Sequence, residues 1–113
     1  VRILKDFNGV VEQVSEDELA NAAAQADRSG LYCCPHTGVA LGALIKLKDK
    51  CTIKSDERVV VVSTAHGLKF SDLKVSYHRL ELTEVNAQYA NPPLELEASY
   101  AAVCQAIEAY MPG

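Results

Sequence analysis

The run of four valines at Val59–Val62 limits the fold of this chain more than any other stretch of its sequence. Its apolar residues are continuous, whereas a strand with one face in water alternates apolar and polar residues. The run therefore predicts a strand that is covered on both faces, as in a parallel sheet. Helical patterns precede and follow it in the sequence, and this order predicts an α/β layered architecture.

The region before this strand is predicted to start with a second, shorter strand and a helix. Val10–Val14 is rich in β-branched residues, which predicts a strand. Ser15 and Glu18 have the spacing of a capping box and predict the start of a helix. Ser29-Gly30 predicts the end of that helix, because glycine commonly follows the last helical turn.

Three further helical segments are predicted. The first covers residues 39–50, after a loop at residues 31–38, and its apolar composition predicts that it is largely buried. Gly42 in its interior costs about 1 kcal/mol relative to alanine, which predicts close packing against a neighbour. Residues 71–80 predict a short helix. A terminal helix is predicted from about Ser99, with a buried stripe made of Ala102, Val103, Ala106, Ile107 and Tyr110.

Length and charge exclude several classes of function. The chain has 113 residues, which suits one domain, and 49% of them are hydrophobic, too many for a disordered segment. Its net charge is −4, and its lysines and arginines are scattered. Binding of nucleic acid or of an anionic membrane needs clustered basic residues, so neither is expected as a partner. No apolar run approaches the roughly 20 residues that span a bilayer.

The first nine residues indicate the end of a helix without its beginning. Val1, Leu4 and Lys5 predict its last turns, and Asn8-Gly9 predicts its C-terminal stop. We therefore expect residues 1–113 to form a single partial domain of a longer protein.

The cysteines predict neither disulfides nor a metal site. They are Cys33, Cys34, Cys51 and Cys104, and no two of them form a C-x-x-C pair. A zinc site made of Cys33, Cys34 and His36 with Cys51 lacks the second closely spaced ligand pair of structural zinc sites. We expect buried, reduced thiols instead.

The polar residues after the valine run predict a ligand site. In open α/β sheets, ligands bind beyond the carboxyl ends of the strands, where Ser63 and Thr64 lie. A hydroxyl donates one hydrogen bond and accepts others without bringing a charge into the site. Gly67 permits a tight turn or the close approach of a ligand. His66 and Lys69 are candidates for chemistry.

A purely structural interpretation of these residues stays open. A serine–threonine pair at a strand end often only caps the turn, and a lone lysine such as Lys69 is usually solvated. His36 and His78 are weaker catalytic candidates. A Cys34–His36 nucleophile pair is weaker still, because neighbours in a loop rarely have the required geometry and no third group orients them.

Two long blocks carry a resemblance to a known family. The segments GLYCCPHTGVALGALIKL and DERVVVVSTAHGLKFSDLKVSYH resemble the C-terminal part of plant-type threonine synthases. The segments that flank them, GVVEQVSEDELANAAAQADRSG and YANPPLELEASYAAVCQAIEAY, are similar as well. The resemblance therefore covers essentially the whole chain, in order and with compatible spacing.

This resemblance implies a pyridoxal-phosphate enzyme that converts O-phosphohomoserine and water into threonine and phosphate. It implies the tryptophan-synthase-β-like fold (fold type II), with a three-layer α/β arrangement, a mostly parallel sheet and the cofactor between two domains. Thr64 matches the hydroxyl that hydrogen-bonds the pyridine nitrogen of the cofactor. The segment Pro35–Leu41 is implied to support the site.

The resemblance also implies what this chain lacks. The lysine that binds the cofactor covalently and the loop that binds its phosphate lie upstream in the family, and Lys69 does not match that lysine. No catalytic residue is therefore expected in this chain, which alone should be inactive. An S-adenosylmethionine activator site upstream, a homodimer and a location in the chloroplast stroma are further family expectations.

Two other interpretations remain. One is another lyase or dehydratase of the same cofactor fold, which the length of the PHTGVAL and STAHGLKF matches disfavours. The other is a free-standing, non-catalytic α/β module. Roles for Cys33, Cys34, His36 and His66 are left open.

Overall fold

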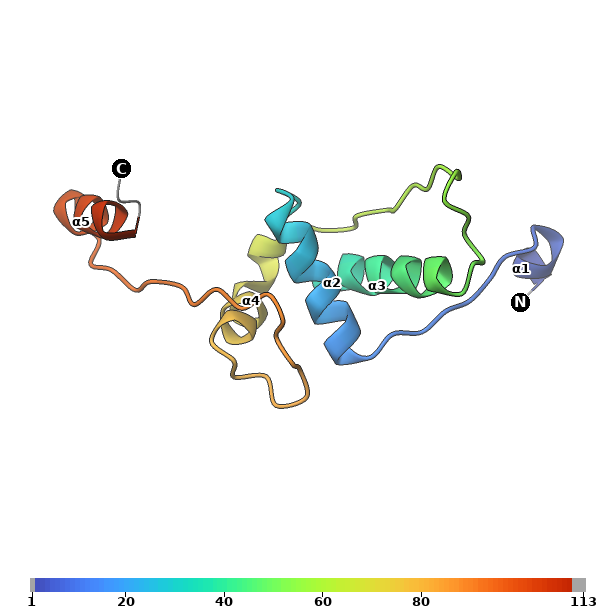
Figure 1. Ribbon diagram of the computed structural model, residues 1–113, viewed down its shortest axis with the longest axis horizontal. Helices are drawn as coiled ribbons and strands as arrows, with labels where there is room; N and C mark the ends of the chain where they lie inside the picture. The colour runs from blue at the N-terminus through green and yellow to red at the C-terminus, as the bar shows by residue number, and fades with distance from the viewer. Residues whose placement is uncertain (1, 111–113) are drawn as a thin grey trace.

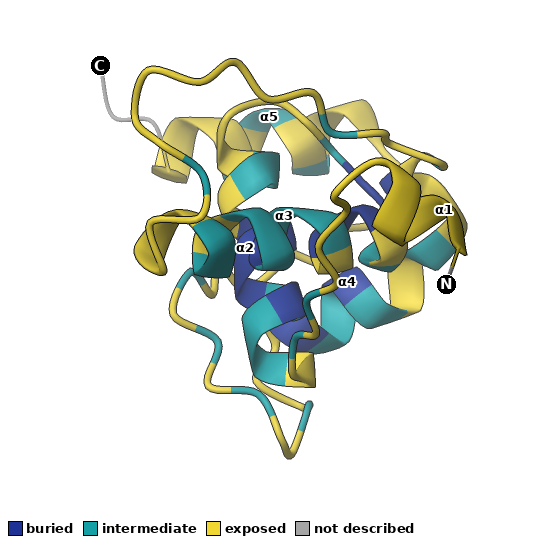
Figure 2. Cartoon of the chain, turned by 90° about the vertical axis from the view of Figure 1, so that its right-hand side faces the viewer, coloured by how far each residue is buried: buried dark blue, intermediate teal, exposed yellow. Residues whose placement is uncertain are grey.

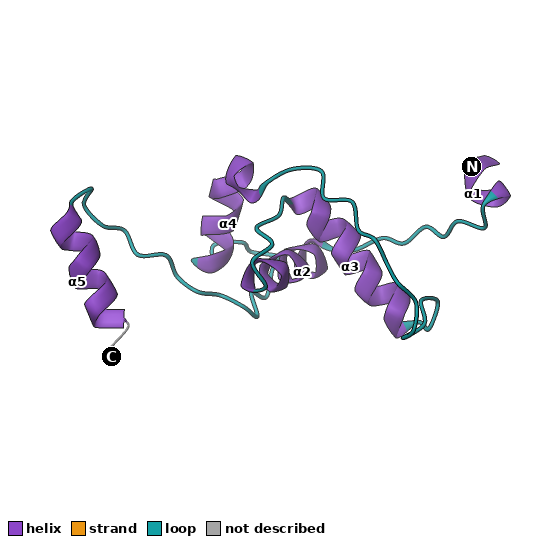
Figure 3. Cartoon of the chain, turned by 90° about the horizontal axis from the view of Figure 1, so that it is seen from above, coloured by secondary structure: helices purple, strands orange, loops and turns teal. Residues whose placement is uncertain are grey.

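The computed structural model describes residues 2–110, and its regular structure is helical. Figure 1 shows the helices in chain order, and Figure 3 shows loops and turns between them with no strand in residues 2–110. The elements are α1 (Arg2–Asp6), α2 (Glu16–Arg28), α3 (Pro35–Asp49), the 3-10 turn η1 (Gly67–Phe70), α4 (Ser71–His78) and α5 (Tyr100–Tyr110). The helices predicted near residues 16–28, 71–80 and 99–110 are thus confirmed, as is the helical turn before Asn8-Gly9, except at Val1, which lies outside the described residues.

Helix α2 begins as the sequence predicts. The Ser15 side chain accepts a hydrogen bond from the Glu18 backbone N–H at 3.2 Å. The Glu18 carboxylate accepts one from the Ser15 backbone N–H at 2.7 Å. This reciprocal capping box satisfies two backbone donors that helix geometry leaves without partners. The helix ends at Arg28, and Gly30 has a φ of +91°, which favours glycine.

Helix α3 begins four residues earlier than predicted. Pro35–Gly38, expected in a loop, form its first turn, with Pro35 at the start and Cys34 as the N-cap residue. Proline suits this position because its fixed φ is already helical and its missing N–H is not needed there. Pro35 therefore begins a helix, although the sequence predicts a loop at this position.

Glycines allow α3 to lie directly on α2. A Cβ atom at Gly38 would sit 2.6 Å from the Leu19 carbonyl oxygen and 3.1 Å from the Ala23 Cβ atom. At Gly42 it would sit 3.1 Å from a γ-carbon of Val14. The close packing predicted for Gly42 is confirmed, but much of the outer face of α3 is exposed, so the prediction of a largely buried helix is wrong for residues 2–110.

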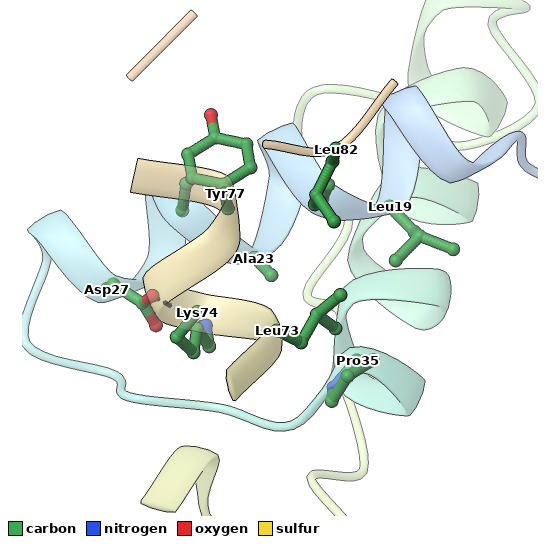
Figure 4. A pocket seen from close by; sticks show the side chains of 10 residues that line it. Leu19, Ala23, Asp27, Pro35, Leu73, Lys74, Tyr77 and Leu82 are labelled. Carbon is green, nitrogen blue, oxygen red and sulfur yellow. Dashed lines mark hydrogen bonds and ion pairs between the residues drawn. The ribbon is translucent and has the colours of Figure 1, made fainter. Parts of the chain in front are cut away.

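Helix α4 packs against α2 through a small apolar cavity and an ion pair. Leu19, Leu73 and Leu82 line the cavity, which measures about 20 Å³ (Figure 4). The buried Lys74 ammonium lies 2.5 Å from the Asp27 carboxylate. The cavity holds at most about one water molecule, so it is no cofactor site.

The loop after α4 is tied to α2 by buried hydrogen bonds. The Tyr77 hydroxyl donates to the Asn21 side-chain oxygen at 2.7 Å, and the backbone N–H of Gln88 donates to the same oxygen at 3.0 Å. The Asn21 amide donates to the Asn86 carbonyl at 3.1 Å. These contacts, with the close packing of α3 on α2, join α2, α3, α4 and the loop at residues 82–91 into one packed unit, which Figure 2 shows as the region where buried residues gather.

The rest of the chain extends away from this unit. The radius of gyration is 17.7 Å, against about 13 Å for a compact domain of this length. Helices α1 and α5 lie at opposite ends of the molecule (Figure 1). No residue of α5 is buried, so its predicted stripe, including Ile107 at 53% exposure, has no apolar partner within residues 2–110.

The valine run is extended but unpaired. Val60 is 90% exposed, and no strand within residues 2–110 lies beside it. The predicted strand at Val10–Val14 is likewise an unpaired segment. A strand forms only where a neighbour takes up its backbone hydrogen bonds. The mostly parallel sheet, and the single partial domain over residues 1–113, therefore stay predictions. No helix in residues 2–110 is both long and apolar enough to cross a membrane.

Candidate functional site

The segment after the valine run lies against the start of α3. Cys33 and His66 form an antiparallel bridge. The backbone N–H of Cys34 donates to the Ala65 carbonyl at 3.2 Å, and that of Gly67 donates to the Tyr32 carbonyl at 3.0 Å. A Cβ atom at Gly67 would lie 2.7 Å from the Tyr32 ring, so this approach requires glycine.

This approach gathers four small polar side chains, which we call the hydroxyl–thiol cluster: Cys34, Thr37, Ser63 and Thr64. The Cys34 sulfur lies 3.3 Å from the Thr37 hydroxyl and 3.6 Å from the Thr64 hydroxyl. The hydroxyls of Thr37 and Ser63 are 3.2 Å apart. Cys34 is 0% exposed, whereas Ser63 and Thr64 face solvent. The cluster thus has a buried interior and an accessible edge.

The pKa values of the two neighbouring thiols, Cys33 and Cys34, are shifted in opposite directions. Hydrogen bonding from the Thr37 side chain lowers the pKa of Cys34 to about 6, against the effect of burial. The Thr37 backbone, the Thr64 hydroxyl and the His36 side chain contribute to the same shift. Burial raises the pKa of Cys33. Cys34 therefore differs from its neighbour because hydroxyl donors surround it.

The accessible edge of the cluster suits a neutral acceptor. Within residues 2–110, the side-chain hydrogen bond of Thr64 is the one with the Cys34 sulfur, and no carboxylate bonds to its hydroxyl. The Thr64 hydroxyl thus offers one proton and two lone pairs without an adjacent carboxylate. The pyridine nitrogen of pyridoxal phosphate is an acceptor when unprotonated, so the donor set at Thr64 fits that part of the cofactor.

The other predicted candidates lie outside this cluster or play local roles. The His66 ring nitrogen Nδ1 accepts from the Leu68 backbone N–H at 3.2 Å and so caps η1. The His78 ring accepts from the Asn91 backbone N–H at 3.0 Å, and burial lowers its pKa. Lys69 is exposed, and the His36 ring lies 6.0 Å from the Phe70 ring.

The cysteines are free thiols in differing environments. Cys33 and Cys34 are buried, as predicted, whereas Cys51 is exposed just after α3 and Cys104 is half-buried in α5. The prediction of burial is therefore wrong for Cys51, which follows the helix end with a φ of +56°. No group of three or more potential metal ligands occurs in the part of the chain that the structure describes.

The sequence interpretation missed Cys34 as the partner of Thr64, and Thr37 as the partner of Cys34 and Ser63. The signal was the Cys-Pro pair: a proline at the first helical position makes Cys34 the N-cap residue. Thr37 is then the third residue of the helix, and its hydroxyl meets the Cys34 sulfur at 3.3 Å, although Cys34 makes no side-chain hydrogen bond to the helix backbone. The assignment of Pro35 to a loop concealed this geometry.

The chain is similar to several curated proteins, although no family model matches it. Threonine synthase 2, chloroplastic, from Arabidopsis thaliana is 46% identical over 111 residues, which cover 98% of this chain and 22% of that protein. Threonine synthase from a Bacillus strain is 30% identical over 76% of this chain and 25% of the bacterial protein. Threonine synthase from Methanocaldococcus jannaschii is 32% identical over 59% of this chain and 17% of the archaeal protein. The chain spans about a fifth of the length of these relatives.

Proposed function

The chain belongs to the threonine synthase family, and from this premise we propose that it is the C-terminal part of a pyridoxal-phosphate-dependent threonine synthase. The whole enzyme converts O-phosphohomoserine and water into L-threonine and inorganic phosphate. Identity of 46% over 98% of the chain is the observation that carries this proposal.

In this proposal Thr64 is the cofactor-binding residue. Its exposed hydroxyl donates a hydrogen bond to the pyridine nitrogen of the cofactor. When bound, the cofactor supplies an electron sink for the substrate's carbon atoms. A neutral hydroxyl leaves the ring nitrogen unprotonated, whereas a carboxylate would favour its protonation. Thr64 thereby moderates the electron sink, and this limits side reactions.

The other parts of the active site come from outside this chain. The covalent lysine, the loop that binds the cofactor phosphate and the S-adenosylmethionine activator site are proposed to lie upstream. Lys69 is not assigned the role of that lysine, and residues 1–113 alone are inactive. In the whole protein, the valine run becomes an inner strand of a mostly parallel sheet in a three-layer fold, and its carboxyl end presents Thr64 to the cofactor.

The setting of the enzyme is proposed from the family. The plant relative is named as chloroplastic, which supports a location in the chloroplast stroma. There the surroundings would keep the four cysteines reduced. The enzyme acts on a small molecule as a homodimer, without nucleic acid or membrane as partner.

The test uses the full-length enzyme with Thr64→Val, which removes the hydroxyl and keeps the shape. Loss of one hydrogen bond should weaken binding of pyridoxal phosphate about two- to tenfold. The fold should be unaffected because Thr64 is exposed. Thr83→Val, also exposed but outside the cluster, is the matched control. Phosphate release from O-phosphohomoserine distinguishes this enzyme from a dehydratase, and its absence in the wild-type protein would contradict the proposal.

A further inference from the structure

The hydroxyl–thiol cluster contains a residue that acts on the cofactor site without touching it. We propose that Cys34, as a thiol, donates its proton to the Thr64 oxygen and so directs the Thr64 hydroxyl proton toward the ring nitrogen. Cys34 is then a positioning residue. This inference rests on the proposed function, because it assigns the partner that orients Thr64.

Burial restricts the partners of the Cys34 sulfur. The residue is 0% exposed, so water does not compete for its hydrogen bonds. The hydroxyls of Thr37 and Thr64 lie 3.3 Å and 3.6 Å from the sulfur, distances suited to hydrogen bonds of sulfur. Thr37 is itself 1% exposed and held in the first turn of α3. The sulfur therefore touches Thr64 from a fixed position.

The count of protons allows two directions for this series of hydrogen bonds. Each hydroxyl and the thiol carries a single proton. If Ser63 donates to Thr37, Thr37 to Cys34 and Cys34 to Thr64, every acceptor in the series is satisfied. The Thr64 proton then remains for a group at the accessible edge. In the reverse direction Thr64 donates to the sulfur and presents only lone pairs, which cannot bind an acceptor nitrogen.

The charge state of Cys34 decides between the two directions. A thiolate, the form that a pKa of about 6 favours at neutral pH while the site is empty, accepts only and draws the Thr64 proton inward. A thiol supplies a proton of its own, so the proposed direction applies to the occupied site. An acceptor nitrogen at Thr64 withdraws one of the hydrogen bonds that favour the thiolate. Binding of an acceptor at Thr64 therefore favours the thiol form of Cys34, and the thiol form in turn favours binding of the acceptor.

The neighbouring cysteine provides a matched control. Cys33 is 1% exposed, and its side chain is outside the hydroxyl–thiol cluster. Cys33→Ala and Cys34→Ala therefore remove the same atom from adjacent buried positions. Only the second removes the donor to Thr64.

The experiment reads the ring nitrogen directly. Full-length enzyme is loaded with pyridoxal phosphate carrying nitrogen-15 in the ring, and the nitrogen resonance and the Kd are measured. Thr64→Val and Cys34→Ala should move the resonance in the same direction, and each should weaken binding about two- to tenfold. Cys34→Ser, which keeps a donor, should restore both values, and Cys33→Ala should leave both at wild type. The double variant Cys34→Ala with Thr64→Val should match Thr64→Val alone, because Cys34 acts through Thr64.

Two outcomes overturn different claims. If Thr64→Val moves the resonance and Cys34→Ala does not, Cys34 has no positioning role, and the proposed function stands. If the wild-type enzyme binds no pyridoxal phosphate, or Thr64→Val moves nothing, the assignment of Thr64 fails and this inference fails with it. Thr37→Val breaks the series one step further from Thr64 and should move the resonance less, in the same direction. It replaces Cys34→Ala if that variant does not fold, and an unmoved resonance then counts against the inference.

Discussion

The packed unit of α2, α3, α4 and the loop at residues 82–91 differs from the valine run and α5 in how apolar side chains are used. In the packed unit, Ala23 is 5% exposed and lies against α3, and Tyr77 is 4% exposed beneath the loop. In the extended parts, Val60 is 90% exposed and Tyr100 is 87% exposed. The extended α5 is more apolar in sequence than the packed α2 and α4, so a hydrophobic pattern specifies a surface to be covered but not which segment covers it.

The largest expected effect lies in the buried ion pair of the packed unit. Lys74→Ala should lower the free energy of unfolding by about 3–5 kcal/mol, because it leaves the Asp27 carboxylate without its counter-charge. The side chain of Lys74 is 8% exposed and that of Asp27 is 13% exposed. Urea unfolding measures the loss. Arg79→Ala removes an ion pair with the exposed Glu95 and should cost about 0–1 kcal/mol. Equal losses in the two variants would contradict the distinction between the regions.

The next largest change in stability is expected when a methyl group is added at a glycine of α3. Gly38→Ala should cost about 1–3 kcal/mol, because the new Cβ atom meets the rigid Leu19 carbonyl oxygen at 2.6 Å. Gly42→Ala should be nearly neutral, since a gain of about 1 kcal/mol in helix propensity offsets a contact with the movable Val14 side chain. Thermal unfolding of both variants, at matched concentration, measures the difference. If Gly42→Ala were less stable than Gly38→Ala, the closest approach of α3 to α2 would not lie at Gly38.

Loss of the Tyr77 hydroxyl should give an effect of similar size. Tyr77→Phe removes the donor to the buried Asn21 oxygen and should cost about 1–3 kcal/mol. Amide hydrogen exchange should quicken at Gln88 and Tyr89, whose N–H groups bond to Asn21 and to Tyr77. Tyr100→Phe is the control, and its exposed hydroxyl should contribute nothing measurable. Unchanged exchange at both amides would mean that the loop is held by other contacts.

The smallest effect is expected in the valine run of the isolated chain. The same substitution in the full-length enzyme tests whether a sheet covers this run. In the isolated chain, Val60→Thr should change the free energy of unfolding by less than about 0.5 kcal/mol, because Val60 is exposed. In the full-length enzyme the same change should cost about 1–3 kcal/mol if a sheet covers the run, because a hydroxyl is then buried without a partner. Equal effects in both proteins would contradict the proposed sheet.

Local signals predicted the helices well, and contacts between segments account for what they missed. Ser15 and Glu18 fix the start of α2 through atoms three residues apart, which a sequence pattern reveals. The valine run needs a neighbour that is absent from residues 2–110, so its pattern indicates a strand that this chain alone does not pair. Pro35 satisfies both loop and helix-start rules, and only its packing on α2 decides between them.

The candidate site shows the same division. Thr64 was found because it lies in a long motif shared with a family, and its role stays a prediction. Its partner in the cluster, Cys34, is 30 residues away in sequence, and Thr37, which bonds to Cys34 and to Ser63, is equally remote from the motif. No periodicity connects such positions, because the Cys33–His66 bridge brings them together. The sequence motif identifies Thr64 as a donor, but only the three-dimensional structure shows that Cys34 lies beside it.

The hydrogen bonds of Asn21 have a consequence for the order in which the chain assembles during synthesis. Helices α2 and α3 are adjacent in sequence and can pair soon after they leave the ribosome. The amide of Asn21, however, bonds to the carbonyl of a residue made 65 positions later. At 5–20 residues per second this is a delay of about 3–13 s. The amide also donates to Asp17 within α2, so during that interval only the proton destined for Asn86 is hydrated. Docking of the late loop must displace that water, so the packed unit closes from its C-terminal side.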